Sequence, residues 1–310
     1  MPRARAAYFE HHASAAARAR FVKAQKAKLA RLKAAASCTV AVTGGTLPEP
    51  LPAPAPTANE HFVFEDAVSA EDRKTVEDDI AYAAADEQSL TGVSFGDINV
   101  FVGVTPAWLA QEDCGFYGYV GDCLAQKTQE FAGGATEGGY RALFMMRWPS
   151  GQGAPETQKV IAHELFHVFQ YEVSNLANDQ TPSSGVRTLG PVWLHEGAAE
   201  VVGYHVLGDR HLGYATYAAL LATEKGRAAA PAPPLEQLQT VDQDRAADSP
   251  YALYMVAVDH LCSTTGGVQA LSAYYRAIAA GQPWPAAFAS AFGMSVDAFY
   301  ANFAVYRAGL

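Results

Sequence analysis

The chain has 310 residues, of which 50% are hydrophobic and 17% are charged, and its formal net charge is −10. This composition is typical of a globular protein and excludes a wholly disordered one. The charge is uneven, because residues 1–36 hold nine Lys or Arg and one acid, which leaves −18 on residues 37–310. This negative charge on residues 37–310 argues against a nucleic-acid partner. No apolar run approaches the ~20 residues that a membrane-spanning helix needs.

Residues 1–58 differ in composition from the rest of the chain. Residues 1–36 are basic and Ala-rich, but they lack the apolar run that would complete a signal peptide. Residues 47–58 are Pro-rich, which is typical of an extended spacer. We therefore expect an N-terminal segment over 1–58 and one folded domain over 59–310. An export segment, a transit peptide and a misassigned start all remain open as explanations of the basic segment.

The chain has four cysteines, Cys38, Cys114, Cys123 and Cys262. Cys114 and Cys123 bracket a short Gly- and Tyr-rich stretch, which predicts a loop closed by a disulfide. An even number of cysteines fits an oxidising compartment, so the expected location is extracellular or in the cell envelope. The pairing of Cys38 and Cys262 is left open.

The first half of the folded domain predicts both helix and strand. A helix is expected from Ser69 to about Gln88, because Ser69 is a good N-cap residue and acids follow it. The β-branched and aromatic runs 98–102 and 140–148 predict two strands. A Gly-rich bend is expected between them over 133–139.

From residue 159 onward the patterns predict only helices. They are expected over 159–171, 191–207, 212–225, 251–262 and 268–279, with two or three helices in all after residue 250. The order of elements indicates an α+β fold. A small mixed sheet with helices would precede an all-helical part.

The stretch His163-Glu164-Leu165-Phe166-His167 matches the pattern HExxH on one of these helices. Residues four apart lie on the same face of a helix, so both imidazoles can bind one zinc ion at ~2.0–2.1 Å. Glu164 lies about 100° further around the helix. There it can act as a general base on a metal-bound water rather than as a ligand.

A catalytic zinc site usually has three protein ligands, so a third is expected downstream. The motif alone does not choose among the candidates, which are Glu172, His195, Glu196, Glu200, His205 and His211. Two histidines and a carboxylate would also suit Fe(II). Two histidines on an ordinary amphipathic helix remain the simplest alternative to any metal site.

The run Trp193-Leu194-His195-Glu196-Gly197 lies on the next predicted helix. Together with HExxH it resembles the gluzincin zinc metallopeptidases of the peptidase MA clan, which include thermolysin-like and aminopeptidase-N-like enzymes. The resemblance covers about residues 60–310 and implies a zincin-like fold, with an active-site cleft between the sheet-containing part and the all-helical part. It also implies that Glu196 is the third zinc ligand and that Glu200 orients a zinc-bound histidine. Because Glu196 then uses the metal-facing direction of its helix, His195 is expected to line the cleft or to lie on the surface rather than to bind zinc.

Two weaker matches concern the substrate. Ser249-Pro250-Tyr251 is similar to a Pro-Tyr of the aminopeptidase-N-like enzymes, which implies that Tyr251, or else Tyr254, stabilises the oxyanion. Residues 133–138 partly match the loop that holds a substrate's free amine in those enzymes, although its Met and Asn are missing. If that match is meaningful, Glu137 binds the amine and the enzyme is an aminopeptidase.

The expected function is therefore that of a zinc peptidase acting on peptides or proteins. Glu164 would take the proton of a metal-bound water and pass it to the leaving amine. An extended substrate would pair with a strand edge near Ala142–Trp148. A metzincin site is excluded, because Gln170 and Val173 occupy the positions of its glycine and third histidine. The alternative is a zincin-fold binding module that holds zinc without turnover; substrate preference and oligomeric state are left open.

Overall fold

The computed structural model describes residues 59–132, 136–146, 154–177, 179, 181–209 and 216–310. The expectations for residues 1–58, for Cys38, for His211 and for the Trp148 end of the second strand lie outside these ranges.

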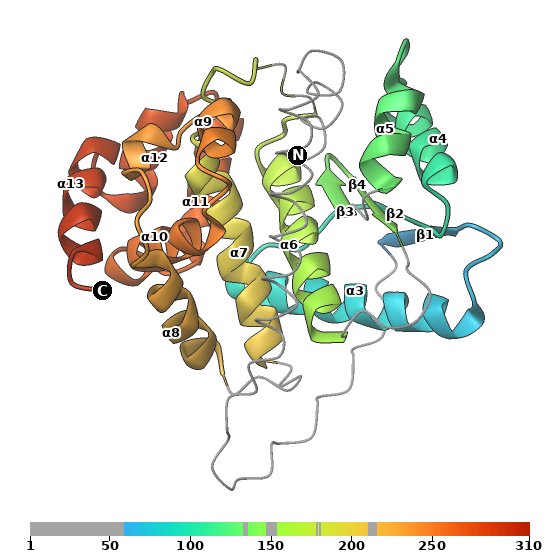
Figure 1. The fold of residues 1–310 in the computed structure, drawn as a ribbon, viewed down its shortest axis with the longest axis horizontal. Coiled ribbons are helices and arrows are strands. Elements are labelled where there is room, and N and C mark those ends of the chain that lie inside the picture. Colours follow the sequence, from blue (N-terminus) through green and yellow to red (C-terminus); the bar gives the residue numbers. More distant parts are fainter. Residues whose placement is uncertain (1–58, 133–135, 147–153, 178, 180, 210–215) are drawn as a thin grey trace, which may run out of the picture. The chain divides into compact units, whose positions relative to one another are not determined.

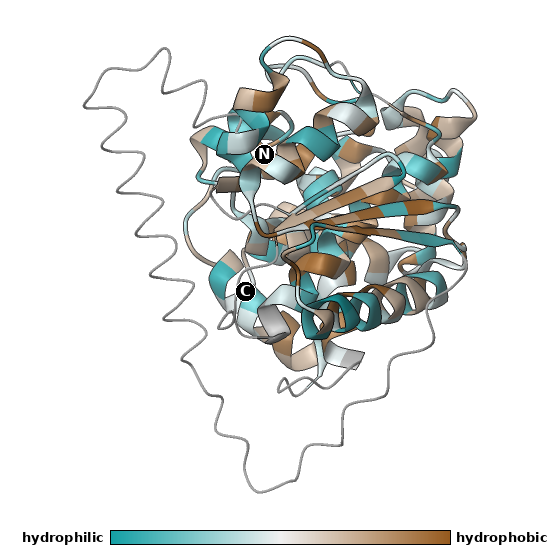
Figure 2. Cartoon of the chain, turned by 90° about the vertical axis from the view of Figure 1, so that its right-hand side faces the viewer, coloured by the Kyte–Doolittle hydropathy of each residue, from teal (hydrophilic) through white to brown (hydrophobic). Residues whose placement is uncertain are grey.

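Four strands form one small mixed sheet. They are β1 (Glu60–Phe64), β2 (Ile98–Gly103), β3 (Thr136–Gly139) and β4 (Ala142–Met146), in the spatial order β1-β2-β4-β3. β1, β2 and β4 are parallel, and β3 runs antiparallel to β4. The inner strands β2 and β4 are almost entirely buried, and the strands in Figure 2 are accordingly drawn largely in hydrophobic colours. A central strand with neighbours on both sides is expected to have this continuous apolar character.

Within the described ranges, one long helix precedes β2, and the elements that follow β4 are all helices. They are α3 (Ala70–Thr91), α6 (Ala154–Val173), α7 (Val192–Asp209), α8 (Tyr217–Ala228), the short 3₁₀ helix η1 (Leu235–Gln237), α9 (Val241–Ala246), α10 (Tyr251–Thr264), α11 (Gln269–Ala279), α12 (Trp284–Phe292) and α13 (Val296–Arg307). The predicted α+β class, with strands first and helices last, is therefore confirmed. Ser69 caps α3 as predicted, its Oγ accepting a hydrogen bond from the Asp72 N–H at 3.1 Å.

The helices α6 and α7 lie side by side at the centre of this arrangement (Figure 1). α6 also contacts β3 and α3, whereas α7 contacts α8 and α10. Leu165 and Phe166 on α6, and Trp193 and Leu194 on α7, are fully buried in the apolar core. Two helices that carry successive sequence motifs are thus fixed against each other by apolar packing.

Several elements were not expected from the sequence, among them β1, β3 and α9. β1 and α9 are short, and β3 occupies part of the Gly-rich run that was predicted to be a bend. Glycine has low strand propensity, but pairing with β4 overrides it here. The region after residue 250 contains four helices, α10 to α13, rather than two or three.

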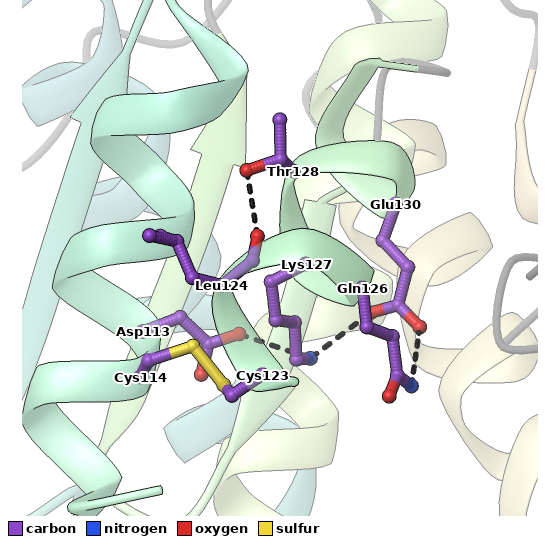
Figure 3. Close-up of a disulfide and its surroundings, with 8 residues drawn as sticks. All are labelled: Asp113, Cys114, Cys123, Leu124, Gln126, Lys127, Thr128 and Glu130. Atoms are coloured by element: carbon purple, nitrogen blue, oxygen red, sulfur yellow. Dashed lines mark hydrogen bonds and ion pairs between the residues drawn. A yellow bond between two sulfur atoms is a disulfide. The ribbon is translucent and has the colours of Figure 1, made fainter. Parts of the chain in front are cut away.

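A second compact unit lies between β2 and β3 in the sequence. It consists of α4 (Pro106–Tyr117) and α5 (Cys123–Ala132). A disulfide joins Cys114 to Cys123, as the sequence predicts (Figure 3). The expected loop is shorter than predicted, because α4 continues to Tyr117 and ends at Gly118, whose φ of 65° is typical of a helix C-cap.

A charge cluster further joins α4 and α5. Lys127 Nζ lies 2.9 Å from Asp113 Oδ2 and 3.2 Å from Glu130 Oε2 (Figure 3). Asp113 is only 1% exposed, so its carboxylate needs a cation nearby. These polar residues therefore have a structural role. The remaining described cysteine, Cys262, is free and buried.

Candidate metal centre

Helix α6 brings two histidine side chains to one point. His163 and His167 are 7% and 6% exposed, and their Nε2 atoms lie 3.1 Å apart. The four-residue spacing places both rings on the same face of α6, as the sequence predicts. Two ring nitrogens this close, and both turned to one side, are the arrangement expected of ligands that share an ion.

Helix α7 adds a carboxylate to the pair. Oε2 of Glu196 lies 3.5 Å from Nε2 of His163 and 3.6 Å from Nε2 of His167. Donors at ~2.0–2.1 Å from a tetrahedral ion are separated by roughly 3.3 Å, so the three atoms have the spacing that such an ion requires. In the part of the chain that the structure describes, these three residues form the buried group able to hold a metal ion.

The other ring nitrogen of each histidine has a polar neighbour. Nδ1 of His163 lies 2.9 Å from Oε1 of Glu200, and Nδ1 of His167 lies 2.7 Å from Oε1 of Gln170. An acceptor at Nδ1 holds the proton there and leaves the Nε2 lone pair available to a metal. Glu200 and Gln170 are therefore placed to orient the two imidazoles for ligation through Nε2.

These two acceptors are themselves held in place. Lys159 forms an ion pair with the same oxygen of Glu200 that lies near His163. The Gln170 amide N–H groups donate to the Tyr275 hydroxyl at 2.7 Å and to the His195 carbonyl at 2.9 Å. Neither Lys159 nor Gln170 was predicted to support the site. Their spacing could have indicated them, because each lies one helical turn from a histidine of the motif.

The charges of the cluster shift the pKa values of its members. Burial lowers the pKa of His163, but the carboxylates of Glu196 and Glu200 outweigh burial and raise it to about 9. Burial raises the pKa of Glu196, yet His167 and His163 hold it well below its usual value. Glu200 is likewise buried, but Lys159 and His163 lower its pKa to about 2. The centre therefore presents two ionised carboxylates at neutral pH.

Glu164 is held beside the three donors by the sheet. Its Oε2 accepts a hydrogen bond from the backbone N–H of Gly138, on β3, at 2.9 Å. Glu164 is half-buried and does not belong to the donor group. A carboxylate fixed by the backbone of a neighbouring strand has a defined orientation, which a general base needs.

Gly138 is required by the close approach of β3 to α6. A Cβ atom at this position would lie 1.8 Å from the Glu164 carbonyl oxygen, a backbone atom that cannot rotate away. We expect Gly138→Ala to lower the free energy of unfolding by roughly 3 kcal/mol, the upper part of the range for overpacking. Urea unfolding of the metal-free protein measures it.

Gly226→Ala is the matched control for this substitution. Gly226 lies in α8, and a Cβ there would have no atom within 4 Å. Alanine should be neutral or stabilising by up to ~1 kcal/mol, because it favours the helix. Equal unfolding free energies for the two variants would show that β3 does not pack tightly on α6.

Helix α10 brings Tyr251 to the same region. The rings of Tyr251 and His163 have centroids 6.2 Å apart. α10 approaches α7 closely at Gly197, where a Cβ would lie 2.4 Å from the Tyr254 carbonyl oxygen. Burial and the nearby Glu196 carboxylate raise the pKa of Tyr251 well above its usual value, so its hydroxyl stays protonated and able to donate. Tyr254, the alternative to Tyr251, is fully buried and donates to Asp244 at 3.0 Å.

Other candidate ligands have different surroundings. Glu172 accepts a hydrogen bond from the Gly96 N–H at 2.9 Å, and His205 stacks on Tyr217. His195 is only 2% exposed and stacks on His167 with ring centroids 4.4 Å apart, so of the two positions expected for it, lining the cleft or lying on the surface, the surface position is excluded. Its close packing follows from its place on α7, which is buried along most of its length.

Glu137 does not join the cluster. A Cβ atom added at Gly138, the next residue on β3, would point at α6. Side chains alternate between the faces of a strand, so Glu137 points to the opposite face of the sheet. The structure therefore offers no support for amine binding by Glu137.

The expectation that β4 is the substrate-binding edge is wrong. β4 lies between β2 and β3 and pairs with both. The strand with a free edge next to α6 is β3, which the sequence did not predict as a strand.

No family model matches this chain, and neither a curated protein nor a solved structure matches it. Its function must therefore be inferred from the metal centre itself.

Proposed function

We propose that the chain is a zinc-dependent peptidase of the gluzincin type with a zincin-like fold. His163, His167 and Glu196 would hold one zinc ion. The observation that carries the proposal is the spacing of their three donor atoms, 3.1, 3.5 and 3.6 Å, next to a carboxylate that is not a donor. Two nitrogens and one carboxylate oxygen leave a fourth position for water, as in catalytic zinc sites.

Zinc, when bound, lowers the pKa of its water and polarises the scissile carbonyl. Glu164 takes a proton from the attacking water and delivers it to the leaving amine. Tyr251 donates its hydroxyl proton in a hydrogen bond to the developing oxyanion. Glu200 and Gln170 keep the two imidazoles oriented throughout. Fe(II) would suit the same donors, but a positioned carboxylate base favours hydrolysis over redox chemistry.

The free edge of β3 is the proposed binding site for extended substrate. The Gly138 N–H points away from β4 and toward Glu164. Because backbone groups alternate along a paired strand, those of Thr136 face the same way. A peptide that pairs with this edge would lie beside the Glu164 carboxylate, as a scissile bond must.

We also propose that the protein acts outside the cytosol, in the extracellular space or the cell envelope. The disulfide between Cys114 and Cys123 is the supporting observation, because such bonds persist in oxidising compartments. None of the helices in the described ranges has the length and hydropathy of a membrane span.

The proposed function is tested by incubating the zinc-loaded protein with a mixed peptide library and identifying the products by mass spectrometry. We expect cleavage that a chelator abolishes and added zinc restores. Zinc binding at one ion per chain without cleavage would support the alternative of a binding module. Cleavage that survives removal of the metal would contradict the proposal.

Zinc binding is expected to depend on pH through His163. With a pKa of about 9, this imidazole is protonated at pH 7 in the metal-free protein, and zinc must displace that proton. Glu196 is already ionised there and contributes no proton. The Kd for zinc should therefore fall by about tenfold per pH unit between pH 7 and 9. Competition titrations with a chromophoric chelator measure it, and a constant Kd over this range would contradict the expected proton release.

A further inference from the structure

The turn in front of Tyr251 has an uncommon backbone conformation. Asp248 and Ser249 have φ values of 59° and 49°, in the left-handed region that residues with a Cβ rarely adopt. Pro250 follows, and α10 begins at Tyr251. Strain in two successive residues persists only where the surrounding structure holds it, and it often marks a functional site.

Asp244, on α9, holds this turn from two sides. Its Oδ2 accepts a hydrogen bond from the Ser249 hydroxyl at 2.9 Å, and its Oδ1 accepts one from the Tyr254 hydroxyl at 3.0 Å. The Ser249 N–H also donates to the Asp244 carbonyl at 3.0 Å. The side chain is only 9% exposed, so these bonds are shielded from water. Asp244 thus fixes the chain two residues before Tyr251 and three residues after it.

The helix that carries Asp244 is itself anchored to α7. Thr240 and Gln243 form a capping box at its start. Just before it, the Gln239 carbonyl accepts a hydrogen bond from the Val192 N–H at 2.9 Å, and Val192 is the first residue of α7. α7 carries Glu196, so the support of Tyr251 is tied to the helix that supplies a metal ligand.

We propose that Asp244 is a positioning residue that holds the strained turn and so places the Tyr251 hydroxyl at the metal centre. This inference rests on the proposed function and deepens it. A hydrogen-bond donor stabilises an oxyanion only over a narrow range of positions. Loosening the turn that positions the Tyr251 hydroxyl should therefore weaken this hydrogen bond without abolishing it. In Asp244→Asn one acceptor oxygen remains for the hydroxyls of Ser249 and Tyr254. We expect this variant to weaken the hydrogen bond that Tyr251 donates to the oxyanion.

A double-mutant cycle on the zinc-loaded protein tests the coupling. The probe is acetohydroxamate, whose metal-bound carbonyl oxygen takes the place of the oxyanion. Tyr251→Phe should weaken binding by about 10–100-fold, the range for a hydrogen bond to a charged group. Asp244→Asn should weaken it at least about fivefold, and the double variant should bind no more weakly than Tyr251→Phe alone. Asp242→Asn is the matched control, because its exposed carboxylate lies on the same helix and should not matter.

Kinetics on a cleaved library peptide provide the second readout. Asp244→Asn should lower kcat and leave KM unchanged, whereas a general loss of structure would affect both. If Asp244→Asn does not fold, Ser249→Ala removes one of the two supporting hydrogen bonds and takes its place in the cycle. Additive losses in the double variant, an Asp244→Asn protein equal to wild type, or no hydroxamate binding by wild type would each overturn the inference. Failure to cleave any peptide would contradict the proposed function alone, because the hydroxamate cycle still decides the role of Asp244.

Discussion

Replacing Glu164 with Gln is expected to lower the rate of peptide cleavage by about 10²–10⁴-fold, the usual contribution of a general base. The amide has nearly the shape of the carboxylate and can still accept the Gly138 hydrogen bond through its oxygen. It has no basic oxygen with which to take a proton from water. Because Glu164 is not a donor in the metal cluster, the variant should bind zinc as wild type does.

The control for this variant is Glu172→Gln on the same helix. Glu172 is partly buried and accepts the Gly96 N–H, so it undergoes the same chemical change away from the metal centre. Cleavage should remain near the wild-type rate in Glu172→Gln and fall only in Glu164→Gln. Undiminished cleavage by Glu164→Gln, measured at saturating zinc, would contradict the proposed mechanism.

Glu196→Gln is expected to weaken zinc binding by about 10²–10³-fold. Zinc sites with four protein ligands bind with roughly 10–16 kcal/mol, so one ligand contributes about 2.5–4 kcal/mol. The amide oxygen is a poor substitute for the carboxylate, and the isosteric change leaves no cavity in the buried site. Competition with a chromophoric chelator measures the affinity.

Thermal unfolding gives an independent readout of the same variant. Zinc at a free concentration 100-fold above Kd should stabilise the wild-type protein by about 2.7 kcal/mol and raise its Tm by roughly 5–10 °C. At the same zinc concentration Glu196→Gln should show little of this increase. Glu236→Gln, a change at an exposed acid outside the centre, should retain all of it. Equal zinc affinities for all three proteins would remove Glu196 from the proposed site.

The close approach of the candidate ligands could be predicted from the sequence in part, because helical periodicity alone brings them together in pairs. His163 and His167 are one turn apart on α6, and Glu196 and Glu200 are one turn apart on α7. Each pair therefore shares a face whatever the tertiary structure is. Only the packing of α6 on α7 had to be assumed, and both helices carry the apolar residues that such packing needs.

The contacts from outside these helices could not be predicted in this way. The Gly138 N–H reaches Glu164 because β3 pairs with β4, and a Gly-rich run gives no local sign of a strand. Likewise, Asp244 reaches Tyr254 through a short helix that has no strong pattern of its own. Both depend on how neighbouring elements pack on one another, which local propensity does not encode.

The most direct test of the metal centre is a crystal structure of the zinc-loaded protein with anomalous diffraction measured at the zinc absorption edge. We expect one strong anomalous peak per chain, about 2.0–2.2 Å from Nε2 of His163, Nε2 of His167 and a carboxylate oxygen of Glu196, with a water in the fourth position. A peak at other residues, or no peak in crystals grown with excess zinc, would contradict the central claim that these three side chains form a catalytic zinc site.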